Sequence, residues 1–497
     1  MPRLSKSRFQ TGLQCYKALW LGSHRPDLKD PIGESQQHIF DTGTRVGELA
    51  RERFVGGVLV TEDHLHATQA LETTRRLLDD PPAAIFEAAL QSGGVMVRAD
   101  AIVRVGEAEW DLYEVKSATK LKGVHITDLA IQVWVLEGAG LRIRRAYLMH
   151  LDNTYVYDGG DHDLERLFVA EDATQLVRDY LPAVPALVAE MGAVLEGPEP
   201  RVPIGRRCDS PYTCSFYGYC HAGMPEHPVT ALPRISAGAL DSLIADGILA
   251  IEDVPENYPG LTAPQRTTCE LIRAGTREII GDVTRSLEPL RYPIHFLDFE
   301  SFNSALPLFP GTRPWQQVLF QWSDHILHED GALEHCEFLY DGTGDPRPTF
   351  ARSLVDALGD EGSVVVYSSF EATRLNELAR DLPEFAEPIA LILPRLFDLE
   401  KVVKAHVRYA ECLGGTSVKV VLPALVPDLS YEGLGIARGD LAALKYAGCV
   451  TGVTVGPERE QIMSDLRTYC GTDTLAMVRL LDVIRGAAGQ NSKRQAG

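Results

Sequence analysis

Residues 98–120 read RADAIVRVGEAEWDLYEVKSATK, a stretch that predicts two β-strands joined by a short polar turn. Asp100 lies at the start of the first strand. In the second strand the side chains alternate between the two faces of the sheet. Glu114 and Lys116 therefore share one face, and Tyr113 and Val115 share the other. Two carboxylates and one lysine are therefore expected to converge at one end of a hairpin.

Carboxylates placed in this way suit the hydrolysis of a phosphodiester bond. They are the oxygen ligands that Mg²⁺ prefers, and Mn²⁺ accepts the same ligands. A bound metal polarises the phosphate and lowers the pKa of a water, while Lys116 positions that water or neutralises the developing charge. Glu-x-Lys is also common on solvated sheet faces, so this interpretation depends on the rest of the chain.

An Asp followed on the next strand by Glu-x-Lys resembles the PD-(D/E)XK nuclease superfamily. For RecB-type members, the resemblance implies a metal ligand on the helix before the first strand and a glutamine on the helix after the lysine. Glu48, in a helix expected over 34–54, and Gln132, in a helix expected over 125–139, match these positions. Leu136 stands where the family often has tyrosine, and a solvated surface residue is the alternative for Glu48.

The totals describe an ordinary globular protein of several domains. The chain has 497 residues, of which 45% are hydrophobic and 24% charged. It contains no run of about 18 apolar residues, so we expect no membrane span, and its start lacks the apolar core of a signal peptide. We therefore expect a cytoplasmic protein whose nine cysteines serve as thiols or metal ligands.

The net charge of −21 disfavours a nucleic-acid partner, because phosphate binding usually leaves a basic footprint. A metal-dependent nuclease nevertheless needs acidic sites, and a local basic groove is compatible with an acidic total. The chain lacks the G-x4-G-K-[ST] pattern of a nucleotide-binding loop. A helicase that acts with this protein would therefore be a separate chain.

Three cysteines, Cys208, Cys214 and Cys220, follow one another at equal spacing. Three thiolates need a fourth ligand to complete a tetrahedral metal site or a cubane cluster, and Cys15 is the candidate. This arrangement resembles the iron–sulfur exonucleases that accompany CRISPR arrays and the AddB-type repair nucleases, which implies a [4Fe–4S] cluster that joins the two ends of the domain. The C-x5-C-x5-C spacing departs from those relatives. A Zn²⁺ site with His221 as a rival ligand, or unrelated buried thiols, are the alternatives.

A second acidic pattern begins in the apolar strand expected for IHFLDFE. Alternation places Asp298 and Glu300 on one side of that strand, ready to share a metal. Glu371 stands in the opening turn of a helix that follows the buried strand SVVVY. Tyr469 and Asp473 stand at i and i+4 of a late helix, so they share one face.

This order resembles the DnaQ-like 3′–5′ exonucleases of the RNase H-like fold, in the subclass that uses tyrosine. The resemblance implies two metals held by the four carboxylates just named, with Tyr469 orienting the attacking water. The family commonly has aspartate where this chain has Glu371, and Asp398 is a rival or additional acid. Lys419 is a candidate phosphate contact or a surface lysine. Ordinary charges at strand and helix ends are the alternative for each carboxylate.

Together these patterns predict an α/β protein with a PD-(D/E)XK nuclease-like domain, a small helical linker module and an RNase H-like domain. The expected bounds are 1–222, 223–290 and 291–485, with a flexible tail over 486–497. The whole resembles bacterial fusions of an iron–sulfur RecB/AddB-like domain with a DnaQ-like domain. It implies a nuclease acting on DNA ends or single strands, with RNA left open, beside helicases or other repair, recombination or defence proteins. The alternatives are a nucleic-acid-binding protein with one inactive domain and a hydrolase of small phosphoesters.

Overall fold

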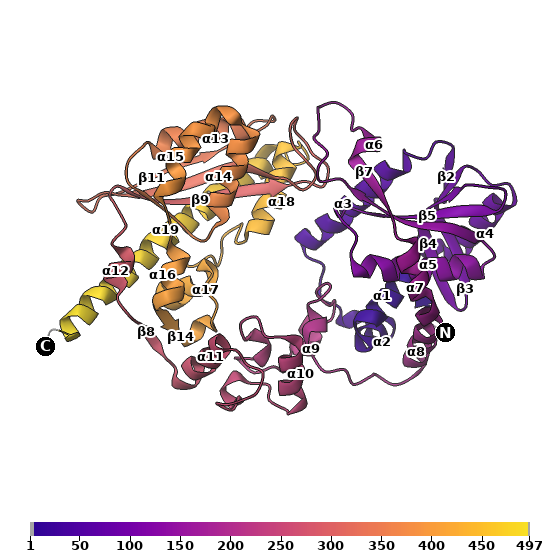
Figure 1. Cartoon of the computed structure of the whole chain (residues 1–497), viewed down its shortest axis with the longest axis horizontal. Helices are drawn as coiled ribbons and strands as arrows, with labels where there is room; N and C mark the ends of the chain where they lie inside the picture. The colour runs from indigo at the N-terminus through magenta and orange to yellow at the C-terminus, as the bar shows by residue number, and fades with distance from the viewer. Residues whose placement is uncertain (1–3, 496–497) are drawn as a thin grey trace. The chain divides into compact units, whose positions relative to one another are not determined.

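The computed structural model describes residues 4–495, which form two compact units (Figure 1). Unit 1 comprises Met1–Gly223 and Ala305–Trp315, and unit 2 comprises Met224–Ser304 and Gln316–Gly497. Both units combine helices with a β-sheet, which confirms the expected α/β, multidomain class. The first boundary lies one residue after the expected position 222, and the helical module expected at 223–290 is part of unit 2.

Unit 1 is built on a mixed sheet with the strand order β2-β3-β4-β5-β6-β7, in which β1 also pairs with β4. The strands are β1 Leu4–Ser5, β2 Gly57–Leu59, β3 Ala84–Ser92, β4 Val95–Arg104, β5 Glu109–Lys116, β6 Arg142–Leu151 and β7 Phe168–Asp172. Strands β3, β4 and β5 form an antiparallel meander, and β6 lies parallel to β5. The hairpin expected from residues 98–120 therefore lies in the middle of the sheet.

Helices cover both faces of this sheet. They are α1 Lys6–Gln14, α2 Tyr16–His24, α3 Glu34–Arg51, α4 Ala67–Asp79, α5 Gly123–Gly138, α6 Leu164–Leu167, α7 Thr174–Tyr180, α8 Val184–Glu196 and α9 Tyr217–His221. Helix α5 is apolar on most sides because it packs between the sheet and the helices α1, α7 and α8. Val46 and Ala50 of α3 are buried in a separate apolar cluster with Met149 and Leu151 of β6.

Unit 2 contains a second sheet with the order β11-β10-β9-β12-β13, in which β9, β10 and β11 are antiparallel and β12 and β13 run parallel to β9. The strands are β9 Ile294–Asn303, β10 Gln317–Leu327, β11 Leu333–Leu339, β12 Ser363–Val366 and β13 Leu396–Asp398. The helices are α12 Val283–Leu287, α13 Arg347–Leu358, α14 Phe370–Asp381, α15 Ala386–Ile392, α16 Leu399–His406, α17 Val418–Leu425, α18 Gly439–Val450 and α19 Gly456–Gln495.

Alternation along β9 divides its side chains between the two faces of this sheet. Leu297 and Phe299 pack in the cluster of α13, α14 and α15, the orange helices grouped over the sheet in Figure 1. Phe296 packs in the opposite cluster, with α16, α17 and α19. Asp298 and Glu300 have the same parity as Phe296, so they face the side of the sheet that α19 covers.

The helical module forms a small core of its own within unit 2. Helix α10 (Ala237–Ala245) and helix α11 (Ala263–Ala274) bury Leu240, Leu243 and Cys269 together with Ala410. Strand β8 (Arg277–Ile279) pairs antiparallel with β14 (Val407–Tyr409), which ties the module to the rest of the unit.

One segment of the chain leaves unit 2 between β9 and β10 and belongs to unit 1. Within Ala305–Trp315, Ala305 and Leu306 are buried in the same apolar cluster as Val46. The indole Nε1 of Trp315 donates a hydrogen bond to the carbonyl of Ser117 at 2.6 Å. The sequence patterns did not predict this excursion, because nothing local distinguishes it from an ordinary strand connection.

The C-terminal helix α19 continues to Gln495, beyond residue 486, where the expected tail begins. Residues 496–497 lie outside the described part of the chain. Among the described residues, none of the helices combines the length and the apolar character that crossing a bilayer requires.

Candidate functional site

Strands β4 and β5 separate at Asp100 and Glu114. Their ladder ends at the pair Ala101 and Tyr113. Beyond that pair, Oδ2 of Asp100 accepts a hydrogen bond from the backbone N–H of Val115 at 2.8 Å, so a side chain takes the place of the next ladder bond. The two carboxylates therefore meet where the sheet opens.

Glu114 is fully buried and is held by donors from three elements. Lys116 Nζ lies 2.5 Å from Oε1, Lys6 Nζ lies 2.9 and 3.1 Å from the two oxygens, and Gln132 Nε2 donates to Oε2 at 2.7 Å. Asp128 of α5 forms a second ion pair with Lys116, at 3.0 Å. We call these five residues and Asp100 site 1; Lys6, Asp100, Glu114 and Lys116 line one cavity of 330 Å³.

The two carboxylates of this hairpin have opposite electrostatic environments. Burial disfavours the charged form of Glu114, but Lys116 and Lys6 outweigh it and lower the pKa of this group. Burial, followed by the negative charge of Glu114, raises the pKa of Asp100 to about 7. Near neutral pH, Glu114 is therefore ionised while Asp100 is poised to gain or lose a proton.

The sequence interpretation missed Lys6 and Asp128. Asp128 precedes Gln132 by four residues on α5, so the i, i+4 spacing was a usable signal. Lys6 gave no such signal because it lies 108 residues from Glu114 in the chain. The structure does not bring Glu48 to site 1: its side chain is exposed, although the adjacent Gly47 lines the cavity.

Glu87 of β3 is a further residue at this cavity that the sequence did not indicate. Its φ of +54° is unusual for a non-glycine residue and costs about 1–3 kcal/mol. The carboxylate forms ion pairs with Arg51 at 3.0 Å and with Arg98 at 3.4 Å. This strained position lies beside Asp100, since the neighbouring residues of β3 and β4 are paired on both sides of it.

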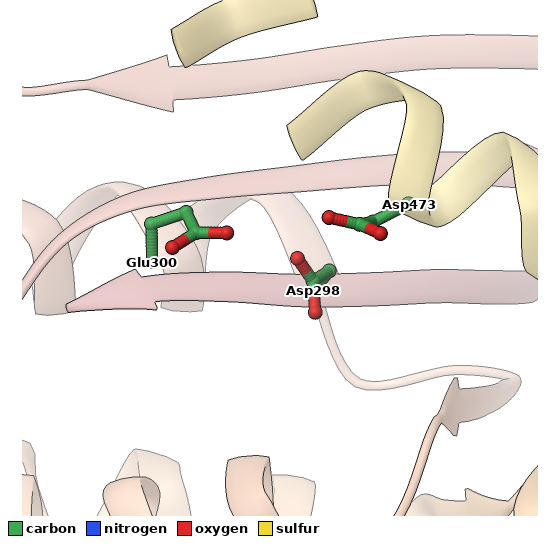
Figure 2. A group of neighbouring side chains, drawn as sticks. All are labelled: Asp298, Glu300 and Asp473. Atoms are coloured by element: carbon green, nitrogen blue, oxygen red, sulfur yellow. The ribbon is translucent and has the colours of Figure 1, made fainter. Parts of the chain in front are cut away.

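A second acidic group, site 2, lies between β9 and α19 (Figure 2). Asp298 and Glu300 extend from the strand, and Asp473 approaches them from the helix. Oxygen atoms of the three carboxylates all lie within 4.8 Å of one another. Glu300 and Asp473 are each 7% exposed, so these charges are largely removed from water.

The charges of site 2 repel one another. Burial, followed by the neighbouring carboxylates, raises the pKa of both Asp298 and Glu300 well above the usual range. Burial raises the pKa of Asp473 to about 6. The nearby Cys470, whose Sγ lies 3.7 Å from Oδ2 of Asp298, is a thiol and therefore brings no positive charge to the site. Carboxylates crowded in this way are a favourable binding site for a divalent cation.

Glu371 stands at the first turn of α14, close enough to interact with this group. It is 2% exposed, and its Oε2 makes no hydrogen bond within the described residues. Burial, followed by the charges of Asp398 and Asp473, raises the pKa of Glu371 to about 8. Its charge also acts on Glu300, although it lies outside the group of three oxygens within 4.8 Å.

Asp398, the rival candidate, has a structural role. Its Oδ1 accepts hydrogen bonds from the N–H groups of Glu400 at 3.0 Å and Ser368 at 3.1 Å. It therefore caps the start of α16 and ties that helix to the turn after β12.

Two tyrosines and a lysine complete site 2. Lys419 Nζ donates to Tyr469 Oη at 2.7 Å, and Tyr431 Oη donates to Asp473 Oδ1 at 2.5 Å. Burial, followed by the charge of Asp473, raises the pKa of Tyr469, so it stays a neutral phenol. Its oxygen accepts from Lys419, and its hydroxyl forms a side-chain hydrogen bond with Asp473. The sequence missed Tyr431, which lies in an irregular segment without a motif.

The four candidate cysteines line one small cavity of unit 1, which we call the thiol cavity: Cys15, Cys208, Cys214 and Cys220. All four are free thiols. Burial raises the pKa of Cys214 to about 11, so its thiol is protonated at neutral pH. The rival ligand His221 does not line this cavity, and its Nδ1 lies 2.8 Å from the carbonyl of Tyr217.

Among the described residues, no three of these four sulfurs lie within 4.8 Å of one another. Zn–S bonds of about 2.3 Å in a tetrahedron would place the sulfurs about 3.8 Å apart.

Comparisons with known proteins match parts of the chain. A family model described as a domain of unknown function (DUF2779) matches residues 295–417, which include Asp298, Glu300 and Glu371. An uncharacterised protein of Ureaplasma parvum is 27% identical over 207 residues, which is 37% of this chain and 30% of that protein. One of Mycoplasma pneumoniae is 27% identical over 210 residues, 37% of this chain and 31% of its own. The chain thus spans about a third of the length of these curated relatives.

Among solved structures, the crystal structure of SSO0001 is 16% identical and covers 45% of this chain and 87% of that chain, with a TM-score of 0.22. A TM-score of this size does not establish a shared fold.

Proposed function

We propose that this chain is a metal-dependent nuclease that hydrolyses phosphodiester bonds of DNA, at ends or in single strands. The observation that carries the proposal is the approach of Asp298, Glu300 and Asp473 to within 4.8 Å in a largely buried setting. Hard divalent cations such as Mg²⁺ and Mn²⁺ take such oxygen ligands. Once bound, they would supply polarisation of the scissile phosphate and an acidified water.

The topology of unit 2 supports an exonuclease of the RNase H-like class. The acidic pair lies on β9, the strand at the centre of the order β11-β10-β9-β12-β13. Glu371 follows the neighbouring strand β12, and Asp473 comes from the last helix. These are the elements and the order that the resemblance to DnaQ-like enzymes implies.

The remaining side chains of site 2 would position the reacting groups. Lys419 holds the Tyr469 oxygen, and Tyr469 hydrogen-bonds Asp473, so its phenol is fixed beside the carboxylates where a water or a phosphate oxygen would enter. Tyr431 fixes Asp473 through its hydrogen bond to Oδ1. Glu371, protonated near neutral pH, offers an oxygen without a hydrogen bond within the described residues. We assign it as an additional metal ligand once it is ionised.

Site 1 would supply a second phosphodiesterase centre of the PD-(D/E)XK type, with Asp100 and Glu114 as metal ligands and Lys116 beside them. Gln132 would hold Glu114 in place. One observation favours a second candidate for this site, namely DNA binding without cleavage. Two lysines already neutralise Glu114, whereas no such pair of cations opposes the carboxylates of site 2 within the described residues.

We further propose a [4Fe–4S] cluster at the thiol cavity and a cytoplasmic location. The cluster would join Cys15, at the junction of α1 and α2, to the segment that carries the three later cysteines. Such a protein would work with a separate helicase or with other repair, recombination or defence proteins, and RNA is a further substrate to test.

The test is cleavage of end-labelled single-stranded DNA by anaerobically purified protein with Mn²⁺. Lys116→Ala removes the lysine of site 1, and Asp298→Ala removes a carboxylate of site 2. We expect Asp298→Ala to abolish stepwise degradation from one end, and Lys116→Ala to remove whatever cleavage persists. Wild-type protein that leaves single-stranded DNA, double-stranded DNA and RNA intact would contradict the proposal. Activity unchanged by one of the substitutions would make that site a binding element.

A further inference from the structure

Lys6 is fixed in site 1 by backbone contacts rather than by its own flexible side chain. Strand β1 pairs in parallel with β4, with Ser5 opposite Met96, and Ser5 then caps the helix that Lys6 begins. Farther along α1, Gln10 Oε1 accepts a hydrogen bond from Thr127 of α5 at 3.0 Å. The Cα of Lys6 is therefore held between the strand of Asp100 and the helix that carries Gln132.

The ammonium group of Lys6 bridges both oxygens of Glu114, at 2.9 and 3.1 Å. It also lies 3.8 Å from Oδ1 of Asp128. A cation that contacts both oxygens of one carboxylate and faces a second acid occupies the kind of position that a bidentate carboxylate offers to a metal. Lys116 is not equivalent, because it contacts a single oxygen of Glu114.

The two acidic sites differ in their internal counter-charges. Site 1 sets the ammonium groups of Lys6 and Lys116 against three carboxylates. At site 2 the lysine at hand, Lys419, donates to Tyr469 and to a backbone carbonyl instead of to a carboxylate. Glu114 of site 1 is thus paired directly with two ammonium groups, whereas Lys419 acts on Glu300 and Asp473 of site 2 only through its charge, without a hydrogen bond to either.

We propose that Lys6 is an internal cation that competes with the divalent metal for Glu114, and that it shifts to a phosphate of the DNA strand when the metal binds. This inference rests on the proposed function of site 1. The 330 Å³ cavity that Lys6 lines leaves room for such a shift, and Lys116 and Arg51 line it as well. Metal loading at site 1 is therefore coupled to substrate, because DNA supplies the anion that the displaced ammonium requires.

The test is Mn²⁺ titration of the full-length protein by calorimetry, in an Asp298→Asn background that suppresses binding at site 2. Glu114→Gln in the same background defines the signal without site 1. Lys6→Met should lower the Kd for Mn²⁺ at site 1 by about tenfold or more, because a competing, partly buried cation is removed. The matched control is Lys29→Met, which removes a charge from an exposed position of unit 1 and should leave the Kd within about twofold.

A second readout separates competition from a structural role. With saturating Mn²⁺, Lys6→Met should raise the KM for Lys116-dependent cleavage several-fold, since the phosphate loses its partner. Tighter metal binding together with weaker substrate binding is not the result of a damaged site, which would weaken both. If Lys6→Met fails to fold, as judged by circular dichroism, Lys6→Arg takes its place. Arginine pairs with carboxylates through a planar fork, so Mn²⁺ binding should become weaker than in wild type.

One outcome would overturn the role of Lys6 and leave the proposed function intact. In it, folded Lys6→Met and the Asp298→Asn protein bind Mn²⁺ with equal affinity, and both bind more than the Glu114→Gln variant does. Unchanged affinity in Lys6→Arg would do the same. If the Asp298→Asn protein and its Lys6→Met variant both bind no more Mn²⁺ than Glu114→Gln does, site 1 binds no metal. The inference then fails together with the proposed metal role of that site.

Discussion

At the scale of single residues, the carboxylates of site 2 destabilise the metal-free protein. Glu371 is buried and its pKa is raised to about 8, so the folded state resists its ionisation while the unfolded state does not. Below a pH of about 4.5 both states hold the proton and there is no penalty. As the pH rises toward 8, the unfolded state loses the proton first, and the stability of the fold falls.

Replacing this acid with its neutral isostere should therefore stabilise the apoprotein. In EDTA at pH 8, Glu371→Gln should raise the free energy of unfolding by about 2 kcal/mol, and the gain should vanish near pH 4. Thermal melts across that range measure it. Glu361→Gln, at an exposed position, is the control and should change little at any pH. A gain that is the same at pH 4 and pH 8 would contradict the burial argument.

Tyr469 is expected to act on the reacting water rather than on the metal. Tyr469→Phe should lower kcat for removal of terminal nucleotides by about 10²-fold, because a positioned proton donor is lost. The Kd for Mn²⁺ should change by a smaller factor than kcat, since Tyr469 is not one of the three clustered acids and only hydrogen-bonds one of them, Asp473. Tyr292→Phe, at an exposed tyrosine of the same unit, is the control. Equal losses of metal affinity and of kcat would instead place Tyr469 in the metal site.

At the scale of elements, the segment Ala305–Trp315 connects two strands of unit 2 but packs in unit 1. Trp315 has a φ of +60°, a left-handed conformation that costs a bulky residue about 1–2 kcal/mol. The hydrogen bond to the carbonyl of Ser117 and the burial of Leu306 offset this cost. Since Ser117 follows Lys116, the segment contacts the end of β5 that carries the Glu-x-Lys pattern.

Trp315→Phe keeps an aromatic ring and removes the indole N–H. It should cost about 1 kcal/mol of stability and reduce Lys116-dependent cleavage, measured in an Asp298→Ala background, by several-fold. Trp322→Phe is a matched control, because Trp322 Nε1 donates to Ser353 Oγ at 3.0 Å within unit 2. It should cost a similar free energy without affecting that cleavage. Equal effects of the two variants on cleavage would argue against support of site 1 by this segment.

At the scale of the whole molecule, the thiol cavity connects the beginning of unit 1 to residues near its boundary with unit 2. Cys15→Ser should abolish the visible absorption of a cluster and reduce the iron content of anaerobically purified protein. The melting temperature should fall, because the cluster no longer links distant parts of the chain. Cys269→Ser, at a buried cysteine outside the cavity, should keep the iron. Zinc instead of iron in wild type would replace the cluster with a structural ion.

Local periodicity along the chain is sufficient to assemble part of each site. Alternation along a strand is enough to put Asp298 beside Glu300 and Glu114 beside Lys116, and helical spacing is enough to put Tyr469 on the face of Asp473. The fold class followed from the same periodicities. Glu48 is exposed and does not line the cavity of site 1. The apolar pattern of a helix predicts which of its faces is buried, but it does not predict which residues at the edge of that face line a cavity.

Which distant residues join these local sets depends on how the folded chain packs. Lys6 reaches Glu114 across 108 positions, Tyr431 reaches Asp473 across 42, and Trp315 reaches Ser117 across 198. Contacts of that kind depend on how strands pair and how helices pack, and they leave no periodic trace near either residue. The charge balance of site 1 and the support of its strand were therefore visible only once the chain was folded.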